Sequence, residues 1–368
     1  MMPVVVFAIS GHGFGHASRQ TQIIRALRRR RPDAAIHIRT SAPRWLFERA
    51  LDFPFSFERV EVDTGVVQVD SLEVDVEASI VRAAAFHDKL DERIDAEARA
   101  LTTAGAELVV GDIPPLAFAA AAHAGVPAMA VGNFTWDWIY SGYPETAELA
   151  PGLVETLHDA YSGAAAAWRL PLHGGFGAFE TIVDVPLVTR QASRRPEDVR
   201  RRLGLPLDRS LALFAFGRYG VGSVDWSEVA RMERWHVVFT NGPHAVAGPE
   251  GDAFTTLDEG AMAGQGVAFE DLVAAVEVVV SKPGYGMIAE CAANDTGLLY
   301  TSRGRFPEYE ILVAGLPALV RAGFIDHDDL FAGRWREHLD RLLAQARPDP
   351  PATDGAQVVA DALAARLA

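Results

Sequence analysis

The chain has 368 residues, 49% of them hydrophobic and 23% charged, which excludes a disordered, collagen-like or disulfide-framework protein. At roughly 150 residues per domain, this length predicts two domains. The 34 basic and 49 acidic residues give a formal net charge of −15, which argues against nucleic acid as a partner.

Apolar runs of strand length alternate with longer amphipathic stretches from the amino terminus onward. Strand-like runs at residues 4–10 and 35–41 flank a helical pattern at 21–31, and further strand-like runs follow at 107–112 and 127–133. This alternation predicts a parallel sheet covered by helices. The first apolar run has no cationic start, so we expect no secretory signal. The longest apolar stretch, at 116–131, contains His123 and a GVP break, so we expect no transmembrane segment. The lone Cys291 permits no internal disulfide and fits a cytoplasmic location.

The same alternation restarts at Leu211, which predicts a second α/β domain. A polar, basic and proline-containing stretch near Arg190 has the composition of a linker. We therefore expect one domain at 1–190 and another at 191–346. A connector and terminal helix at 347–368 would pack back on the first domain.

The first strand ends in the glycine-rich sequence SGHGFGH at 10–16, and we expect a helix from about Ala17. Glycines let the backbone approach a ligand, and a helix amino terminus offers N–H groups to an anion. The G-x-G-x-G spacing argues against a nicotinamide dinucleotide site, as do Thr40 and Ser41 where such a site has an acid. The chain also lacks the P-loop and G-x-S-x-G motifs.

His16 is the candidate general base, because a histidine at the carboxyl end of a strand can exchange protons near neutral pH. The alternative is that His16 and His12 only hold the glycine turn. These histidines are four residues apart but lack the glutamate of H-E-x-x-H, so no zinc site is expected. Asp112 also follows a strand, where it could orient a base or an acceptor hydroxyl, or could cap the next turn.

Aromatic and polar residues are concentrated in NFTWDWIY at 133–140. Rings at this density can stack on a sugar or a planar acceptor, or can belong to the core.

In the second half, SKPGYGMIAE predicts a strand, an anion-binding loop at 283–286 and a helix from about Met287. Lys282 and Glu290 flank that loop, and a solvated surface pair is the alternative for them. The acidic run at 326–329 has the pattern of a helix start, and we expect no metal or other cofactor.

The combination of GHGFGH, SKPGYGMIAE and RGRFPEYE resembles GT-B glycosyltransferases. The sequence also resembles the glycosyltransferase-like amino-terminal region of plant L-arabinokinases. This likeness also involves DTGVVQVDSL from Asp63, GDIPP at 111–115, NFTWDWIY and VDVPLV at 183–188. The 368 residues show no glycine-serine-rich sugar-kinase motif, so kinase activity is not implied.

The resemblance implies an α/β GT-B fold, with two Rossmann-like α/β/α domains whose parallel sheets face a cleft. It implies metal-independent hexosyl or pentosyl transfer, with inversion, from a nucleotide sugar such as a UDP-sugar to a small-molecule acceptor. The domain at 1–190 would hold the acceptor, and the domain at 191–346 would hold the donor. More remotely, the second block is similar to the peptidoglycan N-acetylglucosaminyltransferase, in which the glutamate matching Glu290 holds the ribose.

The expected site residues follow from these motifs. The catalytic residues would be His16 and Asp112. The acceptor-binding residues would be His12, Phe14, Asn133, Trp136 and Asp137. The donor-binding residues would be Gly15, Lys282, Gly284, Tyr285, Gly286, Glu290, Arg303, Arg305, Glu308 and Glu310.

Two alternatives stay open on the same scaffold. A nucleotide-sugar 2-epimerase would consume the donor without an acceptor, and a regulatory sugar-nucleotide-binding protein would bind the donor without turnover. The sequence predicts neither the donor sugar, nor the acceptor, nor the oligomeric state.

Overall fold

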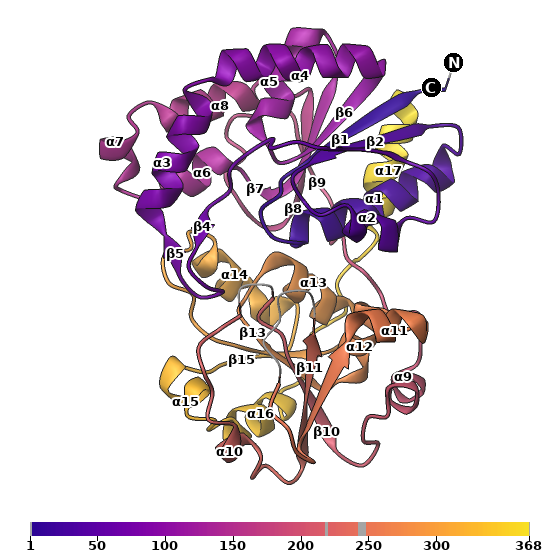
Figure 1. Cartoon of the computed structure of the whole chain (residues 1–368), viewed down its shortest axis with the longest axis vertical. Helices are drawn as coiled ribbons and strands as arrows, with labels where there is room; N and C mark the ends of the chain where they lie inside the picture. Colours follow the sequence, from indigo (N-terminus) through magenta and orange to yellow (C-terminus); the bar gives the residue numbers. More distant parts are fainter. Residues whose placement is uncertain (1, 218–219, 242–247, 368) are drawn as a thin grey trace. The chain divides into compact units, whose positions relative to one another are not determined.

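The computed structural model describes residues 2–217, 220–241 and 248–367. The chain divides into two units (Figure 1). The first unit comprises Met1–Val67, Asp75–Thr189 and Ala352–Ala368, and the second comprises Gln68–Val74 and Arg190–Pro351. Each unit is thus assembled from separate segments of the sequence.

A parallel sheet of seven strands forms the centre of the first unit, in the order β3-β2-β1-β6-β7-β8-β9. The strands are β1 Val4–Ile9, β2 Ala35–Thr40, β3 Ser56–Arg59, β6 Ala106–Asp112, β7 Ala128–Phe134, β8 Ala166–Gly174 and β9 Ile182–Asp184. The strand order reverses direction at β1, which pairs with β2 on one side and with β6 on the other. In open α/β sheets, ligands bind at the carboxyl ends of strands at this reversal, the switch point.

The helices of the first unit are α1 Gly15–Arg30, α2 Trp45–Ala50, α3 Val76–His87, α4 Leu90–Ala104, α5 Pro115–Ala124, α6 Trp136–Ser141, α7 Thr146–Leu149, α8 Leu153–Tyr161 and α17 Gly355–Arg366. Local sequence explains several of their ends. Asp75 caps α3 by accepting a hydrogen bond from the N–H of Ala78. Gly105 and Gly125 end α4 and α5 in the left-handed conformation that favours glycine.

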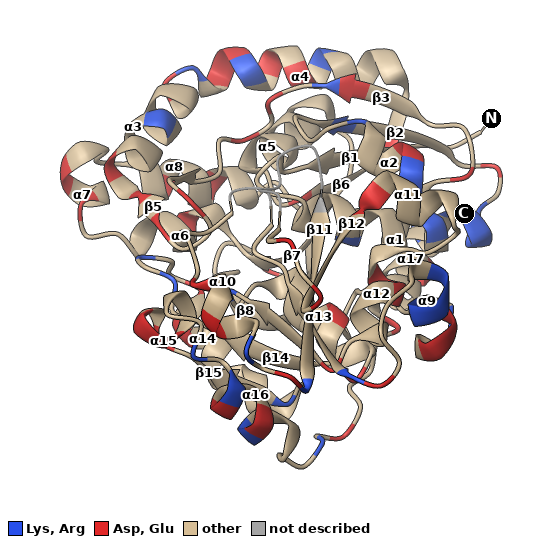
Figure 2. Cartoon of the chain, turned by 60° about the horizontal axis from the view of Figure 1, so that its bottom comes forward, with Lys and Arg blue, Asp and Glu red and all other residues tan. Residues whose placement is uncertain are grey.

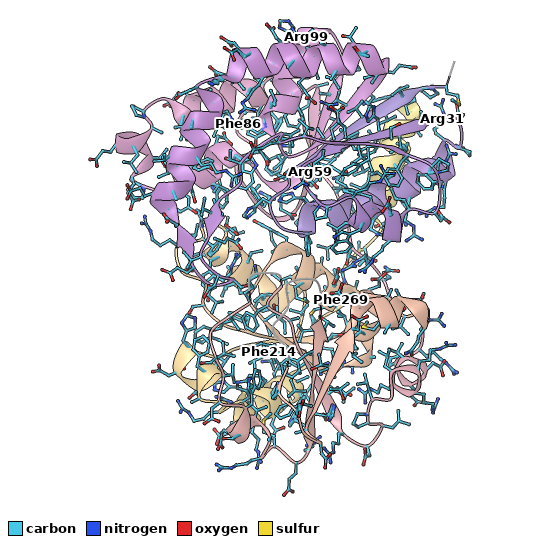
Figure 3. All side chains as sticks on the ribbon, in the orientation of Figure 1. Arg31, Arg59, Phe86, Arg99, Phe214 and Phe269 are labelled. Atoms are coloured by element: carbon cyan, nitrogen blue, oxygen red, sulfur yellow. The ribbon has the colours of Figure 1, made fainter. Side chains whose placement is uncertain are left out.

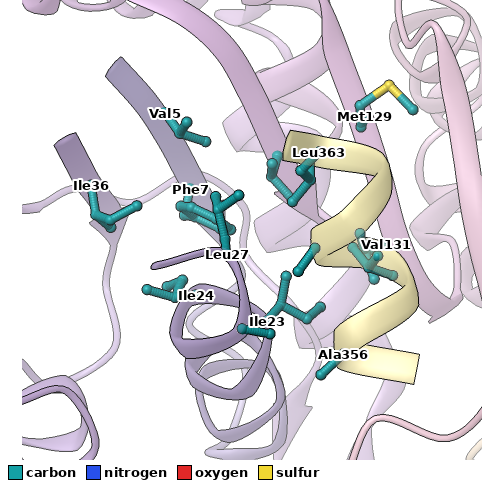
Figure 4. Close-up of a cluster of buried hydrophobic side chains, with 14 of the residues drawn as sticks. Val5, Phe7, Ile23, Ile24, Leu27, Ile36, Met129, Val131, Ala356 and Leu363 are labelled. Atoms are coloured by element: carbon teal, nitrogen blue, oxygen red, sulfur yellow. The ribbon is translucent and has the colours of Figure 1, made fainter. Parts of the chain in front are cut away.

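The last helix, α17, completes the core of the first unit. Figure 1 shows α17, in yellow, beside α1. Val359 and Leu363 of α17 are fully buried in a cluster with Phe7 of β1 and Ile23 of α1 (Figure 4). This apolar contact joins two segments from opposite ends of the sequence.

The second unit contains a parallel sheet of six strands, in the order β12-β11-β10-β13-β14-β15. The strands are β10 Ser210–Phe214, β11 Trp235–Asn241, β12 Phe254–Asp258, β13 Val278–Ser281, β14 Gly297–Tyr300 and β15 Ala322–Phe324. The helices are α9 Pro196–Leu203, α10 Trp226–Val229, α11 Glu259–Gly264, α12 Phe269–Ala275, α13 Tyr285–Ala293, α14 Tyr309–Gly315, the 3₁₀ helix η1 Leu316–Ala318, α15 His327–Phe331 and α16 Arg336–Leu343. The switch point of this sheet lies between β10 and β13.

Aromatic residues fill the core of the second unit. Phe214, labelled in Figure 3, stacks on Trp335 with ring centroids 5.6 Å apart. Leu72 is buried in the same core, although it lies in the short hairpin between β4 (Val67–Gln68) and β5 (Val74–Asp75). The hairpin tip is therefore a structural part of the second unit.

Charged residues lie mainly on the helices, as Figure 2 shows for α4, α9 and α16. Strands β1, β7, β10 and β13 contain none, because strands covered on both faces are apolar. Among the described residues, none of the helices combines the length and the apolar character needed to span a membrane.

Candidate active site

The glycine loop at residues 10–14 joins β1 to α1 and lies close to the end of β2. A Cβ atom on Gly11 would stand 1.8 Å from Oγ of Ser41, so glycine is required at this position. Gly13 has a φ of +72°, where a residue with a Cβ atom is strained. Packing and backbone conformation thus explain the first two glycines of the motif.

Helix α1 begins at Gly15, two residues before the predicted Ala17, so His16 lies in the first helical turn rather than on the loop. The imidazole of His16 is buried, and its Nδ1 lies 2.8 Å from Oδ1 of Asp112. Asp112 ends β6, which pairs with β1 across the switch point. The fold therefore brings together the two candidate catalytic residues, which are 96 positions apart.

Asp112 is completely buried, and three further nitrogen atoms donate to its carboxylate. Nε and Nη2 of Arg19 donate to Oδ2 at 2.8 Å and to Oδ1 at 2.5 Å, and Nε2 of Gln20 donates to Oδ2 at 2.8 Å. Burial alone would raise the pKa of Asp112. The charges of Arg19 and His16 and their hydrogen bonds outweigh it and hold the pKa of this carboxyl well below its usual range. Asp112 is therefore ionised at neutral pH.

The ionised state of Asp112 fixes the tautomer of neutral His16. A carboxylate can only accept hydrogen bonds, so Nδ1 of His16 carries the proton that it shares with Asp112. Nε2 then has a lone pair with which to accept a proton. A histidine oriented in this way by a carboxylate can act as a general base toward a hydroxyl.

Asp63 is a second buried carboxyl near this pair, and sequence reasoning did not select it as a site residue. Oγ of Ser10 donates to its Oδ1 at 3.0 Å, and the indole N–H of Trp136 donates to its Oδ2 at 2.9 Å. Burial raises the pKa of Asp63, and these two hydrogen bonds oppose the rise only in part. The charges of His16 and Asp112 also act on this pKa, so the three groups share one electrostatic environment.

The aromatic residues around the glycine loop pack edge to face. The ring of His12 lies 5.6 Å from that of Trp136, and the ring of Phe14 lies 5.7 Å from that of Trp45, measured between centroids. Trp136 is buried and hydrogen-bonded to Asp63, so its ring packs beside the carboxyl groups of the site. His12 and Phe14 are partly buried.

Asn133 and Asp137 are the two carboxylate or amide residues predicted to bind the acceptor substrate. Only Asn133 contacts the cluster that His16, Arg19 and Gln20 form around Asp112. It lies near the end of β7, accepts a hydrogen bond from Nη1 of Arg19 and donates to the carbonyl of Pro171 at 2.7 Å. Asp137 lies in α6, and its Oδ2 is 3.1 Å from Nδ1 of His158 on α8. Asp137 therefore pairs with a histidine outside the cluster.

In the second unit, the loop at the switch point is shorter than predicted. β13 ends at Ser281 and α13 begins at Tyr285, two residues before the expected Met287. No described atom lies within 4 Å of a Cβ atom built on Gly284 or Gly286. Gly284 is partly buried and Gly286 is exposed, and helix amino termini favour anions.

Lys282 and Arg303 supply two cations after the adjacent strands β13 and β14. The buried Arg303 donates through Nη1 to Oε1 of Glu308 at 3.3 Å, and its guanidinium lies 3.4 Å from the ring centroid of Phe306. Burial, together with the charge of Arg303, lowers the pKa of Lys282 to about 7. An anion bound here would stabilise the protonated form of Lys282.

Glu290 is buried in α13 and is held by Arg190. Nε of Arg190 donates to Oε1 of Glu290 at 2.7 Å, and Nη2 donates to the same oxygen. Nη1 of Arg190 lies 3.4 Å from Oε2 of Glu270, and the guanidinium faces the ring of Phe269, which Figure 3 labels. No sequence pattern indicated this contact.

The other predicted donor residues are spread over three elements. Tyr285 and Gly286 begin α13, Glu308 immediately precedes α14, and the side chain of Glu310 is exposed in its first turn. Arg305 is exposed in the preceding loop. Gly15 belongs to the first unit, where it begins α1.

Sequence reasoning also missed Arg19 and Gln20, although one signal could have found them. They follow His16 by three and four positions, and residues at this spacing share one face of a helix.

The acidic run at 326–329 begins α15, where Asp326 accepts a hydrogen bond from the N–H of Asp329. Throughout the described part of the chain, no three His, Cys, Asp or Glu residues are grouped to hold a metal ion.

No protein-family model matches this chain. The chain is 29% identical to L-arabinokinase from Arabidopsis thaliana over 353 residues, which cover 93% of this chain and 32% of that protein. It thus spans about a third of the length of this curated relative.

Two solved structures show the same architecture. The glycosyltransferase of kitacinnamycin aligns with a TM-score of 0.63 at 15% identity, covering 100% of this chain and 95% of that chain. A UDP-glucosyltransferase from Polygonum tinctorium, capable of glucosylating indoxyl, aligns with a TM-score of 0.62 at 13% identity, covering 100% of this chain and 99% of that chain. The chain has the GT-B glycosyltransferase fold. The predicted fold class of two Rossmann-like α/β units is therefore confirmed, as is the resemblance to GT-B glycosyltransferases and L-arabinokinase.

Proposed function

We propose that this chain is a glycosyltransferase that moves a hexosyl or pentosyl group from a UDP-sugar to a hydroxyl of a small-molecule acceptor. The observation that carries this proposal is the hydrogen-bonded pair of His16 and Asp112 at the switch point of the first unit. The shared fold with a UDP-glucosyltransferase supports the choice of donor nucleotide.

The first unit would hold the acceptor and activate its hydroxyl. Nε2 of His16 accepts the hydroxyl proton while the acceptor oxygen forms a bond to the anomeric carbon of the sugar. The bond from that carbon to the diphosphate breaks, and UDP leaves with the electron pair. The imidazolium that forms is stabilised by Asp112, which stays ionised. One direct displacement of this kind inverts the anomeric configuration.

The second unit would hold the nucleotide through the loop before α13. The N–H groups at the start of that helix and the cations of Lys282 and Arg303 would meet the diphosphate. These charges stabilise the leaving group, so the mechanism assigns no step to a metal ion. Glu290, fixed through Oε1 by Arg190, would accept hydrogen bonds from the ribose hydroxyls.

A panel of nucleotide sugars, tested with and without hydroxyl-bearing acceptors, checks this proposal. We expect release of UDP that depends on an acceptor, together with a glycosylated product of inverted configuration. Conversion of the donor without an acceptor would instead indicate an epimerase. Tight binding of the donor with no turnover on any acceptor would indicate a regulatory protein.

A further inference from the structure

Arg19 connects the groups of the first-unit site without a role in the proton transfer just described. It lies one helical turn after His16 on α1 and donates to both oxygens of Asp112, through Nε at 2.8 Å and through Nη2 at 2.5 Å. Its Nη1 donates to the side-chain oxygen of Asn133. The guanidinium is therefore held from β6 and β7 at once and is almost fully buried.

This two-pronged contact fixes the plane of the carboxylate. A guanidinium presents its donors in a rigid fork that matches the two oxygens of a carboxylate, which a lysine cannot do. Gln20 adds a third donor, on Oδ2, while Oδ1 contacts both Nη2 of Arg19 and Nδ1 of His16. Without Arg19, the buried carboxylate of Asp112 could rotate toward Gln20 and away from the imidazole.

Arg19 also lies against the imidazole itself. Its Nη2 is 3.3 Å from Nδ1 of His16, so the guanidinium, the imidazole and the carboxylate of Asp112 are in mutual contact.

We propose that Arg19 is a positioning residue that aims Asp112 at His16. This inference rests on the proposed function, because it concerns the base of the same site. The role assigned to Arg19 acts through Asp112.

Replacement by glutamine and by lysine tests the role of the fork. Arg19→Gln removes both the fork and the charge, and we expect turnover to fall about 100-fold, the scale for a misplaced catalytic group. Arg19→Lys keeps the charge but loses the fork, so its turnover should also be low.

Arg39 supplies a matched control in the same unit. It forms a buried two-pronged ion pair with Glu97, at 2.6 and 2.7 Å, and also donates to Glu58. Arg39→Gln should lower the thermal stability while turnover is retained. A comparable loss of turnover in this control would show that breaking any buried ion pair has the same effect and would overturn the proposal.

A readout that does not need activity keeps the test independent of the proposed function. Nitrogen NMR of the neutral imidazole of His16 should show the Nδ1–H tautomer in the wild-type protein and a mixture in Arg19→Gln. Identical tautomers would refute the positioning role. If Arg19→Gln does not fold, Arg19→Lys decides, and wild-type turnover in that variant refutes it. Absence of transfer in the wild-type protein, with the expected tautomers, would instead refute only the glycosyltransferase.

Discussion

Asp112 carries a full charge in a site that water does not reach, and its stability contribution can be measured. Four donor atoms, from His16, Arg19 and Gln20, offset the cost of burying this carboxylate. Asp112→Asn keeps the shape but turns an acceptor into a donor that faces other donors. We expect a loss of about 3–5 kcal/mol in the free energy of unfolding, the scale for breaking a buried pair.

The pH dependence of that loss follows from the depressed pKa of Asp112. A group whose pKa is lowered by folding stabilises the protein above its unfolded pKa of about 3.9 and loses this contribution as the pH falls further. The difference between wild type and Asp112→Asn should therefore be constant from about pH 8 to 6 and shrink below about pH 4. Urea unfolding at each pH measures it. A difference that already shrinks near neutral pH would mean that Asp112 titrates there.

Lys282 should take up a proton when a diphosphate binds. Burial and the charge of Arg303 lower its pKa to about 7, so at about pH 8 most molecules carry the neutral amine. A bound anion favours the ammonium form and raises the pKa, which draws a proton from the buffer. Calorimetry with UDP in two buffers of different ionisation enthalpy should show this uptake. Lys282→Met should show none, and a wild-type signal independent of the buffer would place the diphosphate elsewhere.

At the scale of elements, substitutions in α17 measure how much the carboxyl-terminal helix contributes to the stability of the first unit. Leu363 is fully buried against α1 and the first sheet, so Leu363→Ala should cost about 2–5 kcal/mol of unfolding free energy. Val358 on the same helix is 37% exposed, and Val358→Ala should stay within about 0.5 kcal/mol. Urea unfolding compares the two variants. Equal losses would mean that the burial of Leu363 does not account for the contribution of α17.

The elements themselves could largely be predicted from the sequence, and so could part of the site. Alternating strand and helix patterns indicate parallel sheets, and a glycine loop after a strand marks the position of His16. Asp112 could be selected because it ends a strand, but nothing local indicates which loop it faces. Arg190 and Asp63 were missed because a contact such as that between Arg190 and Glu290, 100 positions apart, depends on tertiary packing. Helices α1 and α13 each begin two residues before the position predicted from the sequence, because the signals for helix ends are weak.

At the scale of the whole molecule, neither unit is a continuous piece of the sequence. The first unit needs α17 from the carboxyl end, and the second needs Leu72 from the β4–β5 hairpin. The carbonyl of Ser71 also accepts a hydrogen bond from Nε of Arg303, and the carbonyl of Leu72 accepts one from the N–H of Gly304. Cutting the chain near Arg190 would remove part of the core from each unit, so function must be tested on the full chain.

The most direct test of the proposed function compares His16→Ala with the wild-type protein for acceptor-dependent release of UDP. Loss of a general base costs about 10²–10⁴-fold in rate, and we expect a loss in this range. Calorimetry should show that the variant binds UDP as tightly as the wild type does, because the proposed donor contacts belong to the second unit. A folded His16→Ala variant with wild-type turnover would contradict the role of the His16–Asp112 pair on which the proposed function rests.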